Sequence, residues 1–107
     1  MKTKILTVLM LLATVVMGAS AETFTEAGIN YNTLSYNTVS VTAGTYTGAV
    51  TVPQKVIHSG KSYTITEIGD SAFFKCSNVT AVNIPQSVTR LGLRSFAYSG
   101  ITQITIP

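Results

Sequence analysis

The C-terminal half of the chain repeats itself, and this repetition constrains the fold more than any other feature of the sequence. The segments that begin at Gly69 and Gly92 align at an offset of 23 residues. After a deletion of one residue, segment 79–85 aligns with segment 101–107 at an offset of 22, and both end in proline. A period of this length is typical of solenoids, because one unit cannot bury its own apolar side and must stack on its neighbours.

The segment before each proline predicts a β-strand. Val82 and Ile84 alternate with Asn83, which fits a strand that buries one face. Pro85 then ends the strand, because it has no N–H to donate to a ladder. We expect three such segments to form successive rungs of one parallel sheet: 50–52, 82–84 and 104–106.

The segments 72–74 and 95–97 are expected to form short helical or 3₁₀ turns that carry Phe73 and Phe96 into the interior of their coils. Asp70 precedes the first turn and is a candidate N-cap. The predicted core consists of aliphatic and aromatic residues of the repeats: Val50, Val52, Ile65, Ile68, Phe73, Val79, Val82, Ile84, Val88, Leu91, Phe96, Ile101, Ile104 and Ile106.

A fainter copy of the repeat lies upstream, where segments 50–53 and 65–69 read like parts of the later repeats. Nine additional residues interrupt this copy and predict a hairpin over 56–65, with its turn at Ser59-Gly60-Lys61-Ser62. Residues 22–49 are rich in strand-forming residues and are expected to form a β-rich cap over the first coil.

The N-terminus has the parts of a secretory signal peptide. Lys2 and Lys4 precede an apolar run over 5–16, and Ala19-Ser20-Ala21 supplies a small-residue cleavage site. The apolar run is too short for a stable membrane span. We therefore predict cleavage after Ala21 and a secreted or cell-surface protein, whose mature part contains no membrane span.

The mature part carries little net charge and few reactive groups. Its five Lys and Arg residues face four Asp and Glu residues, a net charge of +1 without a basic cluster, which argues against a nucleic-acid partner. Cys76 is its one cysteine and is expected to fill the coil interior. His58 is expected beside the hairpin turn, and its nearest acid in the sequence is Glu67. Nothing predicts a catalytic residue, a cofactor or a metal site, so we expect no enzyme activity.

A family resemblance rests on the pattern Ile68-Gly69-x-x-Ala72-Phe73, then Cys76, then Val79-x-x-Val82-x-Ile84-Pro85-x-x-Val88. Over residues 44–107, and more weakly back to about residue 29, the chain resembles the BspA-like leucine-rich repeats of bacterial surface proteins. The resemblance implies extracellular adhesion and protein binding without catalysis. Members of that family usually carry many repeats, so we expect further repeats beyond Pro107 and a chain truncated at its C-terminus.

These features predict a mainly β fold. We expect a leucine-rich-repeat solenoid with a parallel β-sheet and short helical or 3₁₀ turns, preceded by an N-terminal β-rich cap with a hairpin insertion. Within the cap, the alternation over 33–42 places Leu34 and Tyr36 on the apolar side of a strand. The predicted divisions are a signal peptide (1–21), the cap (22–49) and the repeats (50–107), whose two regular copies span about 68–90 and 91–107.

The outward residues of two predicted strands form the candidate binding face: Thr80, Ala81, Asn83, Thr102, Gln103 and Thr105. Stacked in register, they give an uncharged surface rich in hydroxyl groups, which suits a protein or glycan partner. Threonine is also favoured on strand faces for packing alone, so a purely structural role stays open. The sequence therefore predicts an adhesion-type binding module or, alternatively, a structural spacer or cap of a larger exported protein whose active region lies beyond residue 107.

Overall fold

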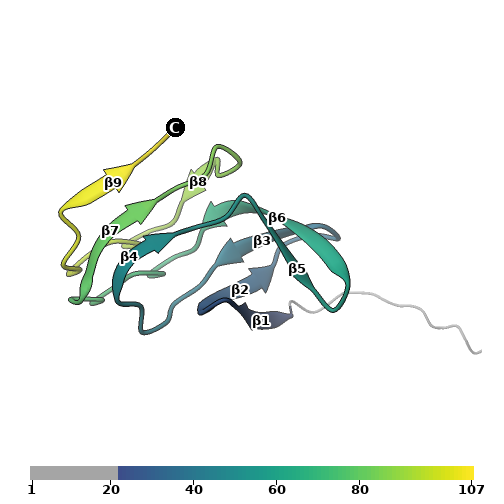
Figure 1. Ribbon diagram of the computed structural model, residues 1–107, viewed down its shortest axis with the longest axis horizontal. Helices are drawn as coiled ribbons and strands as arrows, with labels where there is room; N and C mark the ends of the chain where they lie inside the picture. Colours follow the sequence, from purple (N-terminus) through teal and green to yellow (C-terminus); the bar gives the residue numbers. More distant parts are fainter. Residues whose placement is uncertain (1–21) are drawn as a thin grey trace, which may run out of the picture.

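The computed structural model describes residues 22–107, which form nine β-strands and no helix (Figure 1). The predicted signal peptide, residues 1–21, lies outside the described residues. The prediction of a mainly β fold is confirmed. In chain order the strands are β1 (Thr23–Glu26), β2 (Ile29–Thr33), β3 (Thr38–Val41), β4 (Gly48–Thr51), β5 (Lys55–His58), β6 (Lys61–Ile68), β7 (Val79–Asn83), β8 (Arg90–Leu91) and β9 (Gln103–Thr105).

Successive coils of the chain build a solenoid that contains two sheets. In each coil, a strand of one sheet leads through a turn segment into a strand of the other sheet: β3 into β4, β6 into β7, and β8 into β9. The strands β3, β6 and β8 pair in parallel, and so do β4, β7 and β9, which are neighbouring arrows in Figure 1. Val50 pairs with Val82, and Val82 pairs with Ile104, so the predicted rungs are confirmed.

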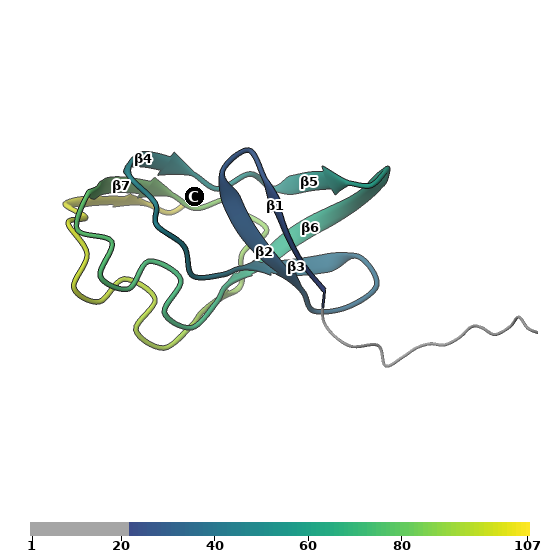
Figure 2. The ribbon, with the colours of Figure 1, turned by 90° about the horizontal axis from the view of Figure 1, so that it is seen from below.

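Strands β1 and β2, which we call the cap from here on, form an antiparallel meander with β3, the first strand of the first coil. Strand β1 pairs with β2, and β2 pairs with β3, so the meander extends the sheet that also contains β6 and β5. In Figure 2, the β5–β6 hairpin points to the end of the molecule opposite β4 and β7. The prediction for Leu34 and Tyr36 is wrong. Strand β2 ends at Thr33, and both side chains are exposed in a loop that closes where the N–H groups of Leu34 and Ser35 bond to the Thr38 oxygen.

The predicted hairpin is present as the antiparallel pair β5–β6, but its turn is shorter than expected, because Lys61 and Ser62 belong to β6 and pair with His58 and Ile57. The two residues between the strands, Ser59 and Gly60, have φ angles of 52° and 77°. A two-residue hairpin turn with φ positive at both positions twists in the same sense as the strands that it joins. Glycine adopts such a conformation without a steric penalty, which explains its presence at the second position.

The segments that join the two sheets are series of tight turns, so the expectation of helical or 3₁₀ turns is wrong. Ser71 and Lys75 both have a φ angle of 59°, and their equivalents Arg94 and Tyr98 have φ angles of 57° and 56°. A left-handed residue at every fourth position interrupts a helix. Alternate N–H groups also bond across to the next coil and are unavailable to a helix: Ser71 to the Leu93 oxygen, Phe73 to the Ser95 oxygen and Lys75 to the Ala97 oxygen.

Asp70 caps the neighbouring coil and not its own turn. Its Oδ1 atom accepts a hydrogen bond of 2.8 Å from the N–H of Leu93. Gly92 makes this close approach possible, because a Cβ atom at residue 92 would lie 2.5 Å from the backbone nitrogen of Asp70. The stacking distance between two coils is thus set where Asp70, Gly69 and Gly92 meet.

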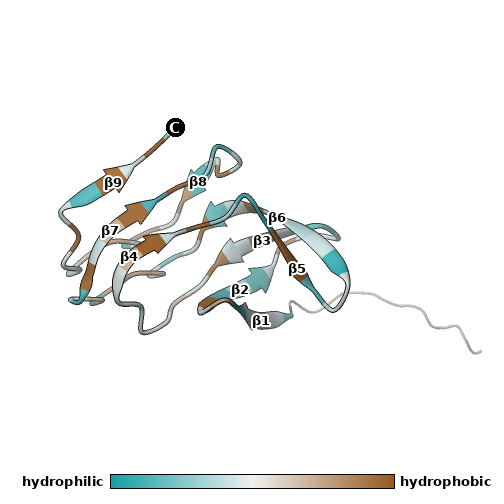
Figure 3. Ribbon diagram, viewed as in Figure 1, coloured by the Kyte–Doolittle hydropathy of each residue, from teal (hydrophilic) through white to brown (hydrophobic). Residues whose placement is uncertain are grey.

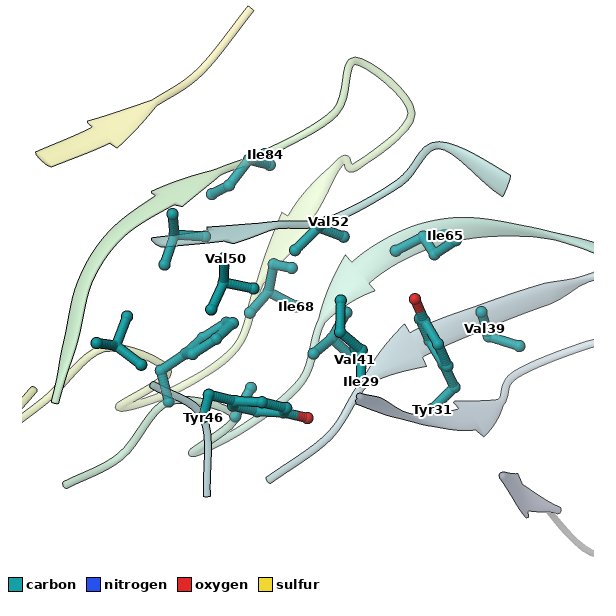
Figure 4. Packing of buried hydrophobic residues seen from close by; sticks show 14 of the residues in the cluster. Ile29, Tyr31, Val39, Val41, Tyr46, Val50, Val52, Ile65, Ile68 and Ile84 are labelled. Atoms are coloured by element: carbon teal, nitrogen blue, oxygen red, sulfur yellow. The ribbon is translucent and has the colours of Figure 1, made fainter. Parts of the chain in front are cut away.

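One continuous apolar core runs from the cap into the coils (Figure 4). Figure 3 shows apolar segments on β4 and β7, which contribute Val50, Val79 and Val82 to this core. Most predicted core residues are buried, and Val88, Phe96 and Ile101 pack against the core while partly exposed. The prediction is wrong for three residues, which are exposed: Leu91, Ile104 and Ile106. No further coil of residues 22–107 packs over them.

Candidate functional site

The outward side chains of β4, β7 and β9 form two lines across the three strands. The register of the parallel pairs aligns one residue of each strand in each line, and we call these lines the outward ladders. Neighbouring strands lie about 4.8 Å apart, which brings the side chains of one ladder into contact. The two outward ladders are Ala49–Ala81–Gln103 and Thr51–Asn83–Thr105.

The alternation of apolar and polar residues positions the second ladder. Val82 and Ile84 are buried, whereas Asn83 between them is exposed. The amide of Asn83 reaches along the ladder, and its Nδ2 atom donates a hydrogen bond of 3.2 Å to Oγ1 of Thr51. This bond holds two ladder side chains in a fixed relationship across successive coils.

A β-bulge adds a further polar residue to the same face. Val79 pairs with Gly48, but Ala81 pairs with Ala49, so Thr80 is the extra residue on β7. The bulge places Thr80 and Ala81 side by side without burying either of them. The Thr80 oxygen accepts two hydrogen bonds from Thr102, at 2.9 Å from the backbone nitrogen and 3.3 Å from Oγ1.

The structure brings the predicted face residues together. Thr80, Ala81, Asn83, Gln103 and Thr105 lie on β7 and β9, and Thr102 directly precedes β9. The prediction missed Ala49 and Thr51, which extend the ladders onto β4. The signal was available, because the buried residues Val50 and Val52 flank Thr51 in the same alternating pattern that identified Asn83.

None of the ladder residues carries a charge. Ion pairs lie on the other sheet, where Arg90 of β8 pairs with Glu67 of β6 and lies 3.9 Å from Asp70. These ion pairs join successive coils at an exposed position, where each contributes little to stability. The outward face therefore offers hydroxyl and amide groups that can both donate and accept hydrogen bonds.

His58 has a partner that sequence reasoning missed. Its Nδ1 atom lies 2.7 Å from Oε2 of Glu26, which is 32 residues away in the chain. The imidazole also stacks on Phe24, with ring centroids 4.1 Å apart. Glu26 and Phe24 belong to β1, so the contact fastens the cap to the β5–β6 hairpin. It lies on the opposite part of the molecule from the outward ladders.

Cys76 fills the coil interior, as the sequence predicts. It is buried, and its Sγ atom donates to the Gly44 oxygen at 3.3 Å. The nearby hydroxyl of Tyr46 donates to the Thr42 oxygen at 2.5 Å and accepts from the Asn30 N–H at 3.1 Å. Burial raises the pKa of Tyr46, although the Asn30 N–H opposes this shift. These contacts lock the segment that leads from β3 into β4.

Residues 56–107 match the family model of the BspA type leucine rich repeat region. The chain thus carries leucine-rich repeats of the BspA type. No curated protein matches its sequence. Solved structures of other bacterial proteins do resemble the BspA-like chain, and they share its fold over most of the described residues.

Three of these structures illustrate the likeness. A leucine rich cell surface protein from Faecalibacterium prausnitzii is 30% identical, with a TM-score of 0.64 over 72% of this chain and 21% of that protein. A leucine-rich repeat protein from Bacteroides ovatus is 31% identical, with a TM-score of 0.68 over 78% of this chain and 23% of that protein. One from Bacteroides capillosus is 26% identical, with a TM-score of 0.67 over 78% of this chain and 64% of that protein. The BspA-like chain thus spans less than two thirds of each of them.

The described part of the BspA-like chain lacks two further features. Across residues 22–107, no helix is long and apolar enough to cross a membrane. Within the same range, no three side chains among His, Cys, Asp and Glu lie close enough together to hold a metal ion. The outward ladders and the bulge at Thr80 are accordingly the candidate site that the geometry of these residues supports best.

Proposed function

We propose that the BspA-like chain is an exported, non-catalytic binding module of the adhesion type, which contacts a protein or a glycan through the outward face of β4, β7 and β9. The observation that carries this proposal is the register of the two outward ladders. Residues that share no local sequence segment, such as Thr51, Asn83 and Thr105, lie in one line on a rigid sheet.

The chemistry of the face suits a partner rich in neutral polar groups. Threonine hydroxyls and the amides of Asn83 and Gln103 can donate and accept, as glycan hydroxyls and peptide groups do. Because the sheet already fixes the backbone that carries these side chains, little backbone conformational entropy is lost when a partner binds. The Faecalibacterium relative is described as a cell surface protein, which supports export of this chain.

A charge-substitution experiment tests the face. Thr80, Asn83, Gln103 and Thr105 are changed together to lysine, and the purified variant is applied to glycan and protein arrays beside the parent. The expected result is loss of the parent's binding with the circular dichroism spectrum preserved. Binding that persists in the quadruple variant would exclude this face as the contact surface.

A matched control separates local contact from added charge. Four residues that are exposed on other parts of the molecule receive the same lysine changes: Gln54, Ser62, Gln86 and Leu93. This control variant is expected to keep the binding of the parent. If it loses binding equally, the effect comes from net charge, and the outward ladders have no special role.

A second function is favoured by the length of the relatives. The chain spans 21% and 23% of two of them, so it can serve as a structural spacer or cap of a larger exported protein. The reading frame beyond codon 107 distinguishes the two functions. A downstream domain with catalytic motifs supports the spacer, whereas further repeats alone support the binding module.

A further inference from the structure

The cap closes only one of the two sheets at the N-terminal end of the solenoid. Strand β3, the first solenoid strand of one sheet, pairs with β2 of the cap. Strand β4 is the first strand of the other sheet, and among the strands of residues 22–107 it pairs with β7 alone. Within residues 22–107, no strand pairs with the other edge of β4, which we call the open edge.

The open edge presents backbone hydrogen-bonding groups. The N–H groups of Gly48 and Val52 donate to the oxygens of Asn78 and Asn83, on the side of β7. Backbone groups of successive strand residues point to opposite edges. The N–H and C=O groups of Ala49 and Thr51 therefore point away from β7, toward the open edge.

A pocket of about 310 Å³ lies along this edge. One wall is the β1–β2 turn, and the other is β4 with the segment that precedes it. Ile29, Tyr46 and Val50 are buried side chains of the lining, while the threonines at its rim are exposed. No residue of the lining carries a charge: Ala27, Gly28, Ile29, Thr45, Tyr46, Thr47, Ala49, Val50 and Thr51.

Natural proteins protect an open edge with charged side chains, with proline or with a covering element. The segment from Thr45 to Thr51 contains neither a charged residue nor a proline. We propose that the open edge of β4 is a second binding site, which takes an extended, uncharged peptide strand of a partner protein. The site uses the backbone groups at the edge of β4, whereas the outward face of the proposed function uses the side chains of the ladders, to which Ala49 and Thr51 also belong.

Two properties of the site specify this occupant. The backbone N–H donors and C=O acceptors of Ala49 and Thr51 alternate along the edge. The backbone of another extended strand carries the same groups at the same spacing and can pair with them. The uncharged lining selects against charged side chains, because a charge that enters the pocket would lose water without gaining a counter-ion.

Backbone methylation of a probe peptide tests the proposal directly. The probe is an end-blocked, fluorescent Thr-Val-Thr-Val-Thr peptide, whose binding to the purified protein is followed by fluorescence anisotropy. Two derivatives carry N-methyl groups on the valine amides or on the threonine amides. Only one edge of a bound strand faces β4, so one derivative is expected to bind about tenfold more weakly, while the other stays within about threefold of the parent peptide.

A pair of protein variants identifies the edge. Thr51→Pro removes an N–H group from the open edge, and edge strands tolerate proline. Thr51→Ala keeps that N–H group and removes only the hydroxyl. Both variants lack the Thr51 hydroxyl of the outward ladder, so the difference between them reports the N–H group alone. The proline variant is expected to bind the probe about fivefold more weakly than the alanine variant.

Several outcomes overturn the proposal. Equal effects of the two methylation patterns exclude pairing through one strand edge, and equal binding by both Thr51 variants excludes β4. Absence of probe binding at about 1 mM peptide excludes a peptide site of useful affinity. The protein could instead form dimers that Thr51→Pro dissociates, while the probe does not bind. In that case the occupant of the open edge is a second copy of the chain and not a partner protein. Because the methylated peptides are tested on the parent protein, the result stands even if Thr51→Pro fails to fold.

Discussion

The ring of Phe73 lies parallel to the ring of Phe96, with centroids 5.5 Å apart and planes inclined by 7°. The two residues hold equivalent positions in successive coils. Tyr46, from the coil that precedes them, packs against Phe73 at a centroid distance of 5.0 Å. An aromatic column thus follows the interior of the solenoid and connects the turn segments of its coils.

The position of each ring in this column predicts the cost of removing it. Phe73 is fully buried, so Phe73→Ala is expected to lower the free energy of unfolding by about 3–5 kcal/mol. Phe96 is partly exposed, and Phe96→Ala should cost about 1–3 kcal/mol because less apolar area is lost. Tyr98→Ala, at a side chain that is 77% exposed, serves as the control, with an expected change within about 0.5 kcal/mol. Urea denaturation measures all three, and a Phe96 cost equal to that of Phe73 would contradict the graded column.

Gly92 is expected to be intolerant of any side chain. A Cβ atom at this position would lie 2.5 Å from Asp70 and 2.6 Å from the backbone carbon of Gly69. Gly92→Ala should therefore force the coils apart and destabilise the protein by about 1–3 kcal/mol. Leu93→Ala, at the adjacent exposed side chain, should change stability by less than about 0.5 kcal/mol. Melting temperatures of the two variants decide the matter, and a Gly92→Ala protein as stable as the parent would show that the coils can separate freely.

The bond from Leu93 to Asp70 is expected to depend on the acceptor and not on the charge. Asp70→Ala removes the acceptor of the 2.8 Å hydrogen bond and should cost about 0.5–1.5 kcal/mol. Asp70→Asn keeps an oxygen at the same position and should stay within about 0.5 kcal/mol of the parent. The comparison uses chemical denaturation at neutral pH. If the asparagine variant is as unstable as the alanine variant, the attraction to Arg90 outweighs the hydrogen bond.

Alkaline pH should destabilise the fold through Tyr31. Burial, together with nearby Tyr46 and Glu26, raises the pKa of Tyr31 to about 12, whereas an unfolded tyrosine titrates near pH 10. Between these values the unfolded state loses its proton first, so stability is complete below pH 10 and falls as the pH rises toward 12. The loss from Tyr31 should reach about 2 kcal/mol at pH 12.

The variant Tyr31→Phe tests the source of this alkaline transition. Its free energy of unfolding should decline less steeply above pH 10 than that of the parent. Some decline should remain, because burial also raises the pKa of Tyr46. Identical pH profiles of the parent and the variant would assign the alkaline sensitivity to another group.

The repeat predicted the β4–β7–β9 sheet because its signals are local. Alternating side chains specify which face of a strand is buried, and a proline at the end of each strand marks where pairing stops, as at Pro85. The same alternation placed Asn83 and Thr105 on one face. Extending it to Thr51 required only that the irregular first repeat be treated as equivalent to the others.

The remaining features depend on information that no short segment contains. Glu26 and His58 meet because β1 is folded back beside the hairpin, and nothing near either residue indicates this contact.

The turn segments were misjudged for a different reason. Ser71, Lys75, Arg94 and Tyr98 adopt left-handed φ angles that their residue types do not favour, and the bonds between coils hold them there.

Hydrogen bonds between successive coils occur on three sides: in both parallel sheets and along the turn segments, where Ser71, Phe73 and Lys75 donate to the next coil. All of them point along the axis on which the coils stack. A force that pulls two coils apart along this axis is therefore shared among three rows of hydrogen bonds. No single row can break bond by bond while the other two remain intact. The molecule should resist stretching along its axis far better than its small core would suggest.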